Sequence, residues 1–135
     1  MPYQAISTMK KTYPILLLSL GLILGGCGAQ YYVKQGNKKY DAYAYSDAVA
    51  QYKKALDKKP LYEAKAKLAN SYRLMNNTTA AEEMYREVVS MPESDSINQF
   101  YFGKVLMENQ KYDEAKKAFQ EYAKRVPDDK VVQGL

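Results

Sequence analysis

The chain has 135 residues and a formal net charge of +5, with no histidine, no tryptophan and a single cysteine. Internal disulfides are therefore excluded, and metal centres or nucleophilic catalysis built on cysteine and histidine are almost excluded. No glycine-rich phosphate loop is present, and the carboxylates follow the spacing of solvent-facing helix positions, as at Glu82, Glu83, Glu87 and Glu114. We therefore expect one small domain that is not an enzyme and uses no metal, cofactor or small-molecule substrate.

The first 26 residues have the three regions of a secretory signal peptide. Lys10 and Lys11 form a short basic patch, an apolar run follows over 15–24, and two glycines close it. The run is shorter than the ~20 helical residues that a membrane-spanning segment needs. We expect residues 1–26 to be a cleaved export signal. The residues before Met9 carry no charge, so Met9 is the expected natural start.

The segment Leu24-Gly25-Gly26-Cys27 resembles the lipobox of bacterial lipoproteins. In that family a peptidase cuts before the cysteine, which then carries a diacylglycerol and an amide-linked acyl chain such as palmitate. The resemblance implies a covalent lipid on Cys27, and two or more acyl chains give stable anchoring. Residues 27–28 would be the lipid anchor. The alternative is a free cysteine buried as a small hydrophobe.

The residues after Cys27 bear on where the protein is held. Gly28, and not an aspartate, follows the cysteine. By resemblance to lipoprotein sorting in Gram-negative bacteria, this implies the outer membrane, and the lack of an acidic tract favours its periplasmic face. Residues 27–62 hold seven lysines against three aspartates. Lysines near an anionic lipid surface contribute ~1 kcal/mol each, although a solvated helix face is the alternative. We expect no nucleic-acid partner.

The chain after Cys27 repeats itself with a period of 33 or 34 residues. An alanine, an aromatic residue four positions later and a proline recur at Ala48, Tyr52 and Pro60, at Ala81, Tyr85 and Pro92, and at Ala115, Phe119 and Pro127. Small residues recur upstream at Gly36, Ala69 and Gly103. This pattern resembles the tetratricopeptide repeat. The resemblance implies an all-α, right-handed superhelix of three helix-turn-helix repeats at about 29–61, 62–95 and 96–129.

The spacing of apolar residues agrees with this fold. The stripe from Leu61 to Met75 steps by three and four residues, as on an amphipathic helix. Ser96 and Gln99 have the spacing of a capping box at the start of the third repeat. Within each repeat, we expect the small residue to let two backbones approach and the aromatic side chain to fill the space beside it.

Residues 130–135 have the pattern of a following helix that is cut short. A repeat array normally closes with a helix that is polar on its outer face. Without such a helix, we expect parts of Ala118, Tyr122 and the neighbouring apolar surface to be exposed. Either a partner covers this end or the chain is the first part of a longer protein.

A binding groove is implied by the family resemblance. In tetratricopeptide arrays the position after the small residue, and the position one turn later, face a groove that takes peptides or partner domains. Here these positions are Asn37, Asn70 and Lys104, followed by Tyr40, Arg73 and Met107. Amides can hold a peptide backbone, and the cations can bind carboxylates. The alternative is a set of ordinary polar residues on an exposed helix face.

An exported lipoprotein that begins with such repeats resembles the N-terminal part of a larger Gram-negative lipoprotein family, in which a β-propeller-like section and an OmpA-like domain follow. That family belongs to the type IX secretion and gliding apparatus, so the resemblance implies a scaffold in an envelope complex, with other envelope proteins or their peptide segments as partners. Three alternatives remain open: a lipoprotein of β-barrel assembly, a pilotin that escorts a secretin, and a docking regulator of a periplasmic cell-wall enzyme.

Overall fold

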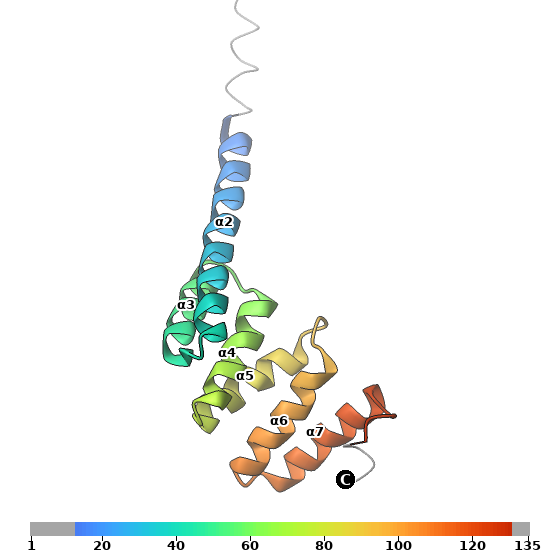
Figure 1. The fold of residues 1–135 in the computed structure, drawn as a ribbon. Helices are drawn as coiled ribbons and strands as arrows, with labels where there is room; N and C mark the ends of the chain where they lie inside the picture. The colour runs from blue at the N-terminus through green and yellow to red at the C-terminus, as the bar shows by residue number, and fades with distance from the viewer. Residues whose placement is uncertain (1–12, 131–135) are drawn as a thin grey trace, which may run out of the picture.

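The computed structural model describes the backbone of residues 13–130 and the side chains from Cys27 onward. Within that range the chain forms helices and connecting turns, with no strand (Figure 1). The helices are α2 (Tyr13–Asp41), α3 (Tyr45–Lys58), α4 (Tyr62–Leu74), α5 (Thr78–Ser90), α6 (Ser96–Glu108) and α7 (Tyr112–Arg125). The predicted all-α fold of paired helices is confirmed.

The first helix runs through the predicted cleavage point. α2 continues without a break past Cys27, so the first repeat's helix extends upstream of residue 29. The apolar run at 15–24 is rich in leucine, a strong helix former, which accounts for the continuity. None of the helices in the described range is both long and apolar enough to span a bilayer. Residues 1–12 and 131–135, which include parts of the predicted signal and of the predicted final helix, lie outside the described range.

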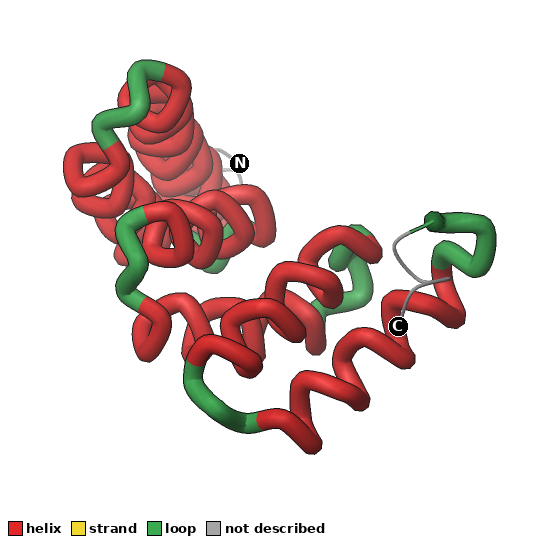
Figure 2. The backbone as a smooth tube through the Cα atoms, turned by 60° about the horizontal axis from the view of Figure 1, so that its bottom comes forward, coloured by secondary structure: helices red, strands yellow, loops and turns green. Residues whose placement is uncertain are grey.

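The helices pack as successive antiparallel pairs. α2 packs on α3, α4 on α5 and α6 on α7, and each pair packs on the next through the contacts of α3 with α4 and of α5 with α6. With the bottom of the molecule tilted toward the viewer, the pairs follow one another along a curved path (Figure 2). This layout places α2, α4 and α6, the first helices of the three pairs, at equivalent positions in the array.

A turn of the same conformation connects the two helices of each of the three pairs. Tyr43, Asn76 and Gln110 have positive φ angles of 59°, 58° and 61°. In each turn the next residue donates its backbone N–H to a carbonyl five positions back, as from Asn77 to Tyr72 at 2.9 Å. These are Schellman motifs, which satisfy carbonyls at a helix end. The repeat in the sequence is therefore matched by a repeat in the backbone conformation of these turns.

Two glycines permit close packing inside a pair, as expected. A Cβ on Gly36 would lie 2.5 Å from the Tyr52 ring, and one on Gly103 would lie 2.7 Å from the Phe119 ring. Real Cβ atoms do not approach other atoms so closely. The predicted pairing of a small residue with an aromatic ring is therefore confirmed at both positions.

The buried core runs along the array in two clusters. One, between the first and second pairs, contains Val33, Ala48, Tyr52, Ala55, Ala64 and Leu68. The other, between the second and third pairs, contains Ala69, Ala81, Tyr85, Val88, Phe102, Val105, Leu106, Ala115 and Ala118. Burial at the interfaces between pairs is thus the main source of stability, because one pair alone cannot cover its apolar face.

The predicted capping box at Ser96 is wrong. Ser96 is already the first helical residue, and the N-cap is Asp95, whose side chain makes no capping bond. The Tyr62 hydroxyl from α4 takes this role: it accepts from the Asp95 N–H at 3.1 Å and from Asn98 Nδ2 at 2.9 Å. It also donates to the Asp95 carboxylate at 3.3 Å. A tyrosine of the preceding repeat thus holds the start of α6.

The expected exposure of Ala118 and Tyr122 is also wrong. Their residual exposures are 3% and 5%, because α7 turns both toward α6, where the Tyr122 ring lies 5.3 Å from the Phe100 ring. The exposed apolar side chains lie on another face. In this pair they are Tyr112 on α7, Met107 at the end of α6 and Ile97 at its start.

Candidate functional site

The structure joins three of the six predicted groove residues, Asn70, Tyr40 and Arg73. Asn70 on α4 lies at the centre of a hydrogen-bond network and donates through Nδ2 to the Tyr40 hydroxyl on α2. Its Oδ1 accepts from Arg73 Nη2 at 2.7 Å, from Arg73 Nε at 3.0 Å and from the Tyr85 hydroxyl at 3.3 Å. Burial raises the pKa of both Tyr40 and Tyr85, so both hydroxyls stay protonated.

Asn37 plays the same part in the first repeat. Its Oδ1 accepts from the Tyr52 hydroxyl at 2.7 Å, and its Nδ2 donates to Glu63 at 2.9 Å. The side-chain amides of Asn37 and Asn70 therefore form hydrogen bonds between helices. A signal for this exists in the sequence, since Asn37–Tyr52 and Asn70–Tyr85 share a spacing of 15 residues.

The third repeat departs from the other two at both positions. Lys104 replaces the asparagine and Phe119 replaces the tyrosine. A phenylalanine has no hydroxyl that needs an acceptor, so the amide is no longer required at this position. Met107, the last of the six, is 49% exposed and lies near Phe119 and Tyr112. Lys104 and Met107 take part neither in the network around Asn70 nor in the bonds of Asn37.

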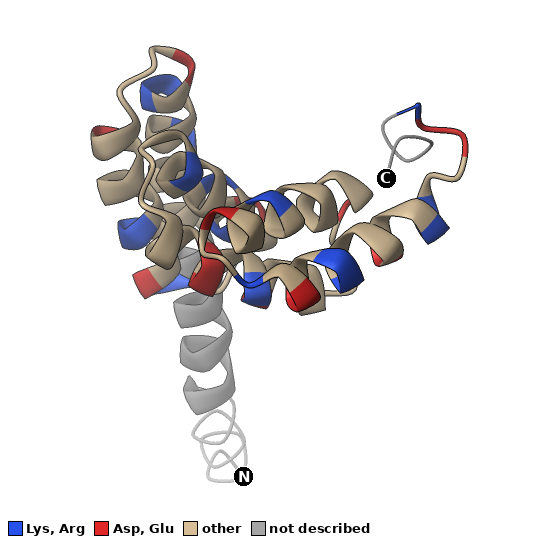
Figure 3. Cartoon of the chain, turned by 90° about the horizontal axis from the view of Figure 1, so that it is seen from below, with Lys and Arg blue, Asp and Glu red and all other residues tan. Residues whose placement is uncertain are grey.

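Three cations lie on the first helices over aromatic rings. Lys67 Nζ is 4.4 Å from the Tyr40 ring centre, the Arg73 guanidinium is 4.1 Å from that of Tyr101, and Lys104 Nζ is 5.9 Å from that of Phe100. We call Lys67, Arg73 and Lys104 the cation row. Figure 3 marks where basic and acidic residues fall along the helices. Among the described residues, no member of the cation row forms an ion pair, so their charges can meet an external carboxylate.

A shallow hollow of about 240 Å³ opens between α4 and α6 beside this row. Sequence reasoning missed it, because it depends on the Tyr62 hydroxyl holding the start of α6 against α4. Its lining combines polar and apolar groups from both helices: Tyr62, Glu63, Ala66, Lys67, Asn70, Asp95, Ile97, Asn98 and Tyr101. The hollow is open and mixed in character, as suits an extended segment better than a small substrate.

The expectation that Glu82 faces solvent is wrong. Its exposure is 8%, and it accepts from Lys111 at 2.6 Å, from Asn109 at 2.7 Å and from Arg86 at 2.9 Å. Burial alone would raise the pKa of this carboxyl, but the three hydrogen bonds outweigh burial and lower the pKa to about 2. The Glu82 carboxylate therefore joins the second pair to the third and has a structural role.

The remaining predicted site residue is Cys27. It is exposed on α2, and the Lys58 side chain lies next to the following residue, 3.2 Å from where a Cβ on Gly28 would be. The alternative of a buried cysteine is thereby excluded for this position. Among the described residues, no cluster of histidine, cysteine, aspartate and glutamate is arranged to hold a metal ion.

Comparison with known proteins supports the repeat assignment. Residues 63–94 and 98–129 match the family model of the tetratricopeptide repeat, so the chain contains tetratricopeptide repeats. No curated protein sequence matches the chain significantly.

Among solved structures, the first tetratricopeptide domain of Spaghetti (RPAP3) bound to the HSP90 peptide SRMEEVD is similar, with a TM-score of 0.73 and 22% identity over 81% of this chain and 87% of that one. The first such domain of human RPAP3 is similar with a TM-score of 0.68 and 22% identity, over 79% and 85% of the two chains. At this identity, the likeness shows the fold.

Proposed function

We propose that this array of tetratricopeptide repeats is a non-catalytic scaffold that binds an extended, acidic segment of a partner protein along α2, α4 and α6. The observation that carries the proposal is the cation row. Lys67, Arg73 and Lys104 each lie over an aromatic ring. None of them forms an ion pair with a carboxylate among the described residues. Cations that are already positioned lose little side-chain entropy when they bind a carboxylate.

The SRMEEVD peptide is a suitable probe, because a structurally similar domain has been solved with it and because it is acidic. We would titrate the fluorescently labelled peptide with the full chain in nanodiscs and follow anisotropy. The double variant Lys67→Glu/Lys104→Glu should weaken binding by about tenfold, since two charge-assisted contacts are lost. The amidated peptide should bind as well as the free acid, because internal carboxylates make the contacts.

The matched control has the same change of net charge away from the row. Lys38→Glu/Lys117→Glu replaces two exposed lysines on α2 and α7, and this variant should bind the peptide as the unmodified chain does. Equal weakening in both double variants would mean that the peptide responds only to net charge. That result, or no binding at all, would contradict the groove assignment.

We further infer that a covalent lipid on Cys27 holds the array at the periplasmic face of the outer membrane. The support is the lipobox resemblance together with the exposure of Cys27 and the Lys58 side chain beside Gly28. The intact mass of the protein extracted from membranes with detergent tests this directly. An N-terminus at Cys27 with the added mass of two or three acyl chains is expected, and an unmodified Cys27 would overturn the anchor.

Within the envelope, the proposed role is that of a scaffold in a secretion and gliding complex. The support for this finer proposal is the family resemblance of a lipobox followed at once by tetratricopeptide repeats. Crosslinking from the cation row in intact cells tests it, for example through a photoreactive residue at Lys104. Crosslinks to components of that apparatus are expected, and crosslinks only to a barrel-assembly protein or a cell-wall hydrolase would contradict it.

A further inference from the structure

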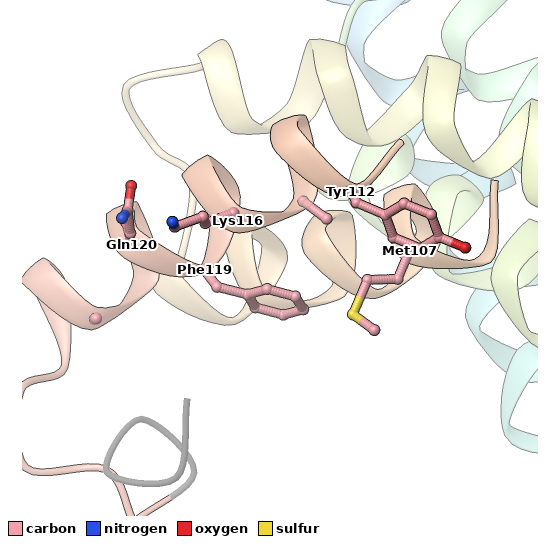
Figure 4. Close-up of a pocket in the computed structure, with 7 residues that line it drawn as sticks. Met107, Tyr112, Lys116, Phe119 and Gln120 are labelled. Atoms are coloured by element: carbon pink, nitrogen blue, oxygen red, sulfur yellow. The ribbon is translucent and has the colours of Figure 1, made fainter. Parts of the chain in front are cut away.

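The outward face of α7 is uncovered within the described part of the chain. It borders a hollow of about 500 Å³, and the Phe119 and Met107 side chains project into the same space (Figure 4). Tyr112, at the start of α7, is 64% exposed. The lining is largely apolar and comprises Met107, Tyr112, Ala115, Lys116, Phe119, Gln120 and Ala123. We call this surface the terminal face.

The equivalent positions on α5 are covered by the third helix pair. Tyr85, which corresponds to Phe119, is fully buried, and its ring centre lies 6.5 Å from that of Tyr101 on α6. Thr78, which corresponds to Tyr112, accepts through its backbone carbonyl from Asn109 at 3.2 Å. The α5 surface thus shows what a helix and its following turn do when they cover this part of a repeat.

The charge on the two surfaces is opposite. On α5 the buried carboxylate of Glu82 accepts hydrogen bonds from Asn109 and Lys111 in the turn after α6. On α7 the equivalent residue is Lys116, the only charged side chain among the described residues that line the hollow. A segment that covers α7 as α6 covers α5 would therefore need a carboxylate, not an ammonium group, in the turn that follows its helix.

We propose that the terminal face binds an amphipathic helix from a partner protein, with an aromatic side chain over Phe119 and an acidic residue in the following turn beside Lys116. The aromatic requirement follows from the position of Tyr101 over Tyr85, and the acidic one from the reversal of charge between Glu82 and Lys116. This surface is separate from the cation row, so the inference goes beyond the proposed function.

The chain supplies its own probe. A peptide of residues 96–111 contains the helix and turn residue that cover α5, and its Lys111→Glu version carries the charge that Lys116 requires. Both peptides would be titrated, with a fluorescent label, onto the full chain in nanodiscs. The Lys111→Glu peptide should bind about fivefold more tightly than the natural one, which is the upper range for an exposed ion pair.

Charge reversal in the protein locates the contact. With Lys116→Glu the preference should invert, so that the natural peptide becomes the tighter ligand. Lys38→Glu, an equal change on an exposed lysine of α2, should leave the original preference intact. The affinity for SRMEEVD should be the same in the Lys116→Glu variant, so that failure at this face is distinguishable from failure of the cation row.

Three results would overturn the proposal. The first is no binding of either peptide, and the second is an equal affinity for both peptides in both protein variants. The third is binding that occurs only after residues 131–135 are removed, because the occupant would then be this chain's own C-terminal segment. Inversion of the preference by Lys116→Glu, with no change in Lys38→Glu, would establish it.

Discussion

The two ends of the array are built from equivalent positions but present opposite surfaces. In α4 and α6, the face that packs on the preceding pair is buried through Ala64, Leu68 and Ser71 and through Asn98, Phe102 and Val105. The equivalent positions of α2 are Tyr31, Gln35 and Lys38. Tyr31 is 59% exposed, Lys38 is exposed and Gln35 is partly buried. At the other end, Tyr112 of α7 and Met107 of α6 are exposed around an apolar hollow.

This difference gives the array a direction. Polar residues at the first end let α2 face water where a preceding pair would pack, as terminal repeats require. The last end keeps the apolar character of an internal interface. Internal interfaces supply most of the stability of a repeat array. A helix that packs on the exposed face of α7 should therefore stabilise the folded array.

Substitution of the packed glycines should give the largest difference in stability between the two ends. We expect Gly36→Ala to cost about 2 kcal/mol of unfolding free energy, because overpacking outweighs the gain in helix propensity. The Tyr52 ring that it would strike is fully buried, and its hydroxyl is tied to Asn37. Gly103→Ala should cost less than about 1 kcal/mol, since Phe119 borders the open hollow and can shift. Urea unfolding of both variants measures the difference.

Gly28→Ala is the control for this pair. Its Cβ would meet only the flexible Lys58 side chain, so stability should be unchanged or slightly increased. Equal losses at Gly36 and Gly103 would mean that Phe119 is as confined as Tyr52, and that the last end is not open.

Removal of the buried carboxylate at the covered interface should have the next largest effect. Glu82→Ala leaves Lys111 without its acceptor and Asn109 with the Thr78 carbonyl alone, and it should cost about 2 kcal/mol. At the equivalent position of the last end, Lys116→Ala should stay within about 0.5 kcal/mol, because the side chain is exposed. Thermal unfolding monitored by circular dichroism tests both. A large loss from Lys116→Ala would show that this end is already covered.

The same carboxylate gives the covered interface a dependence on pH. The folded-state pKa of Glu82 is about 2, against an ordinary value of 4.5. Its stabilising effect is therefore fully present above about pH 4.5 and is lost as the pH falls toward 2. The difference in stability between the unmodified chain and Glu82→Gln should shrink over that range. A difference that is constant from pH 6 to pH 2.5 would mean that Glu82 is not held as a carboxylate.

The tyrosine hydroxyls should give the smallest effects. Tyr52→Phe should cost about 1 kcal/mol, because Asn37 Oδ1 loses the Tyr52 donor. Tyr85→Phe should cost less than about 1 kcal/mol, because Asn70 Oδ1 still accepts from Arg73. At the last pair, Phe119→Tyr alone should give no gain, whereas Phe119→Tyr/Lys104→Asn should recover about 1 kcal/mol by restoring the bond of the other repeats. Equal stability of the single and the double variant would contradict the assigned role of the amide.

Local patterns in the sequence predict the fold well because the repeats are local. The small residue and the aromatic residue four positions after an alanine meet within one helix pair, as the contacts of Gly36 and Gly103 confirm. The contacts between pairs are harder to predict. Glu82 has the spacing of a surface residue, and only the turn residues Asn109 and Lys111 of the next pair show why it is buried.

The candidate site was predictable in part for the same reason. The pattern places Asn37, Asn70, Tyr40 and Arg73 on the first helices, but it cannot reveal that the two amides are engaged by Tyr52 and Tyr85. The cation row depends on rings that lie one turn away or in a neighbouring repeat, such as Tyr101 beneath Arg73. The distances between the cations and these rings depend on how neighbouring repeats pack, and they cannot be predicted from the sequence of one repeat.

The most direct test of the account is amide hydrogen exchange of the full chain in nanodiscs, with and without saturating SRMEEVD peptide. We expect slower exchange on peptide binding in α4 and α6, which carry the cation row, and no change in α7, whose terminal face the peptide does not touch. Slower exchange in α7 alone, or no change in any helix, would contradict the assignment of partner binding to the first helices of the array.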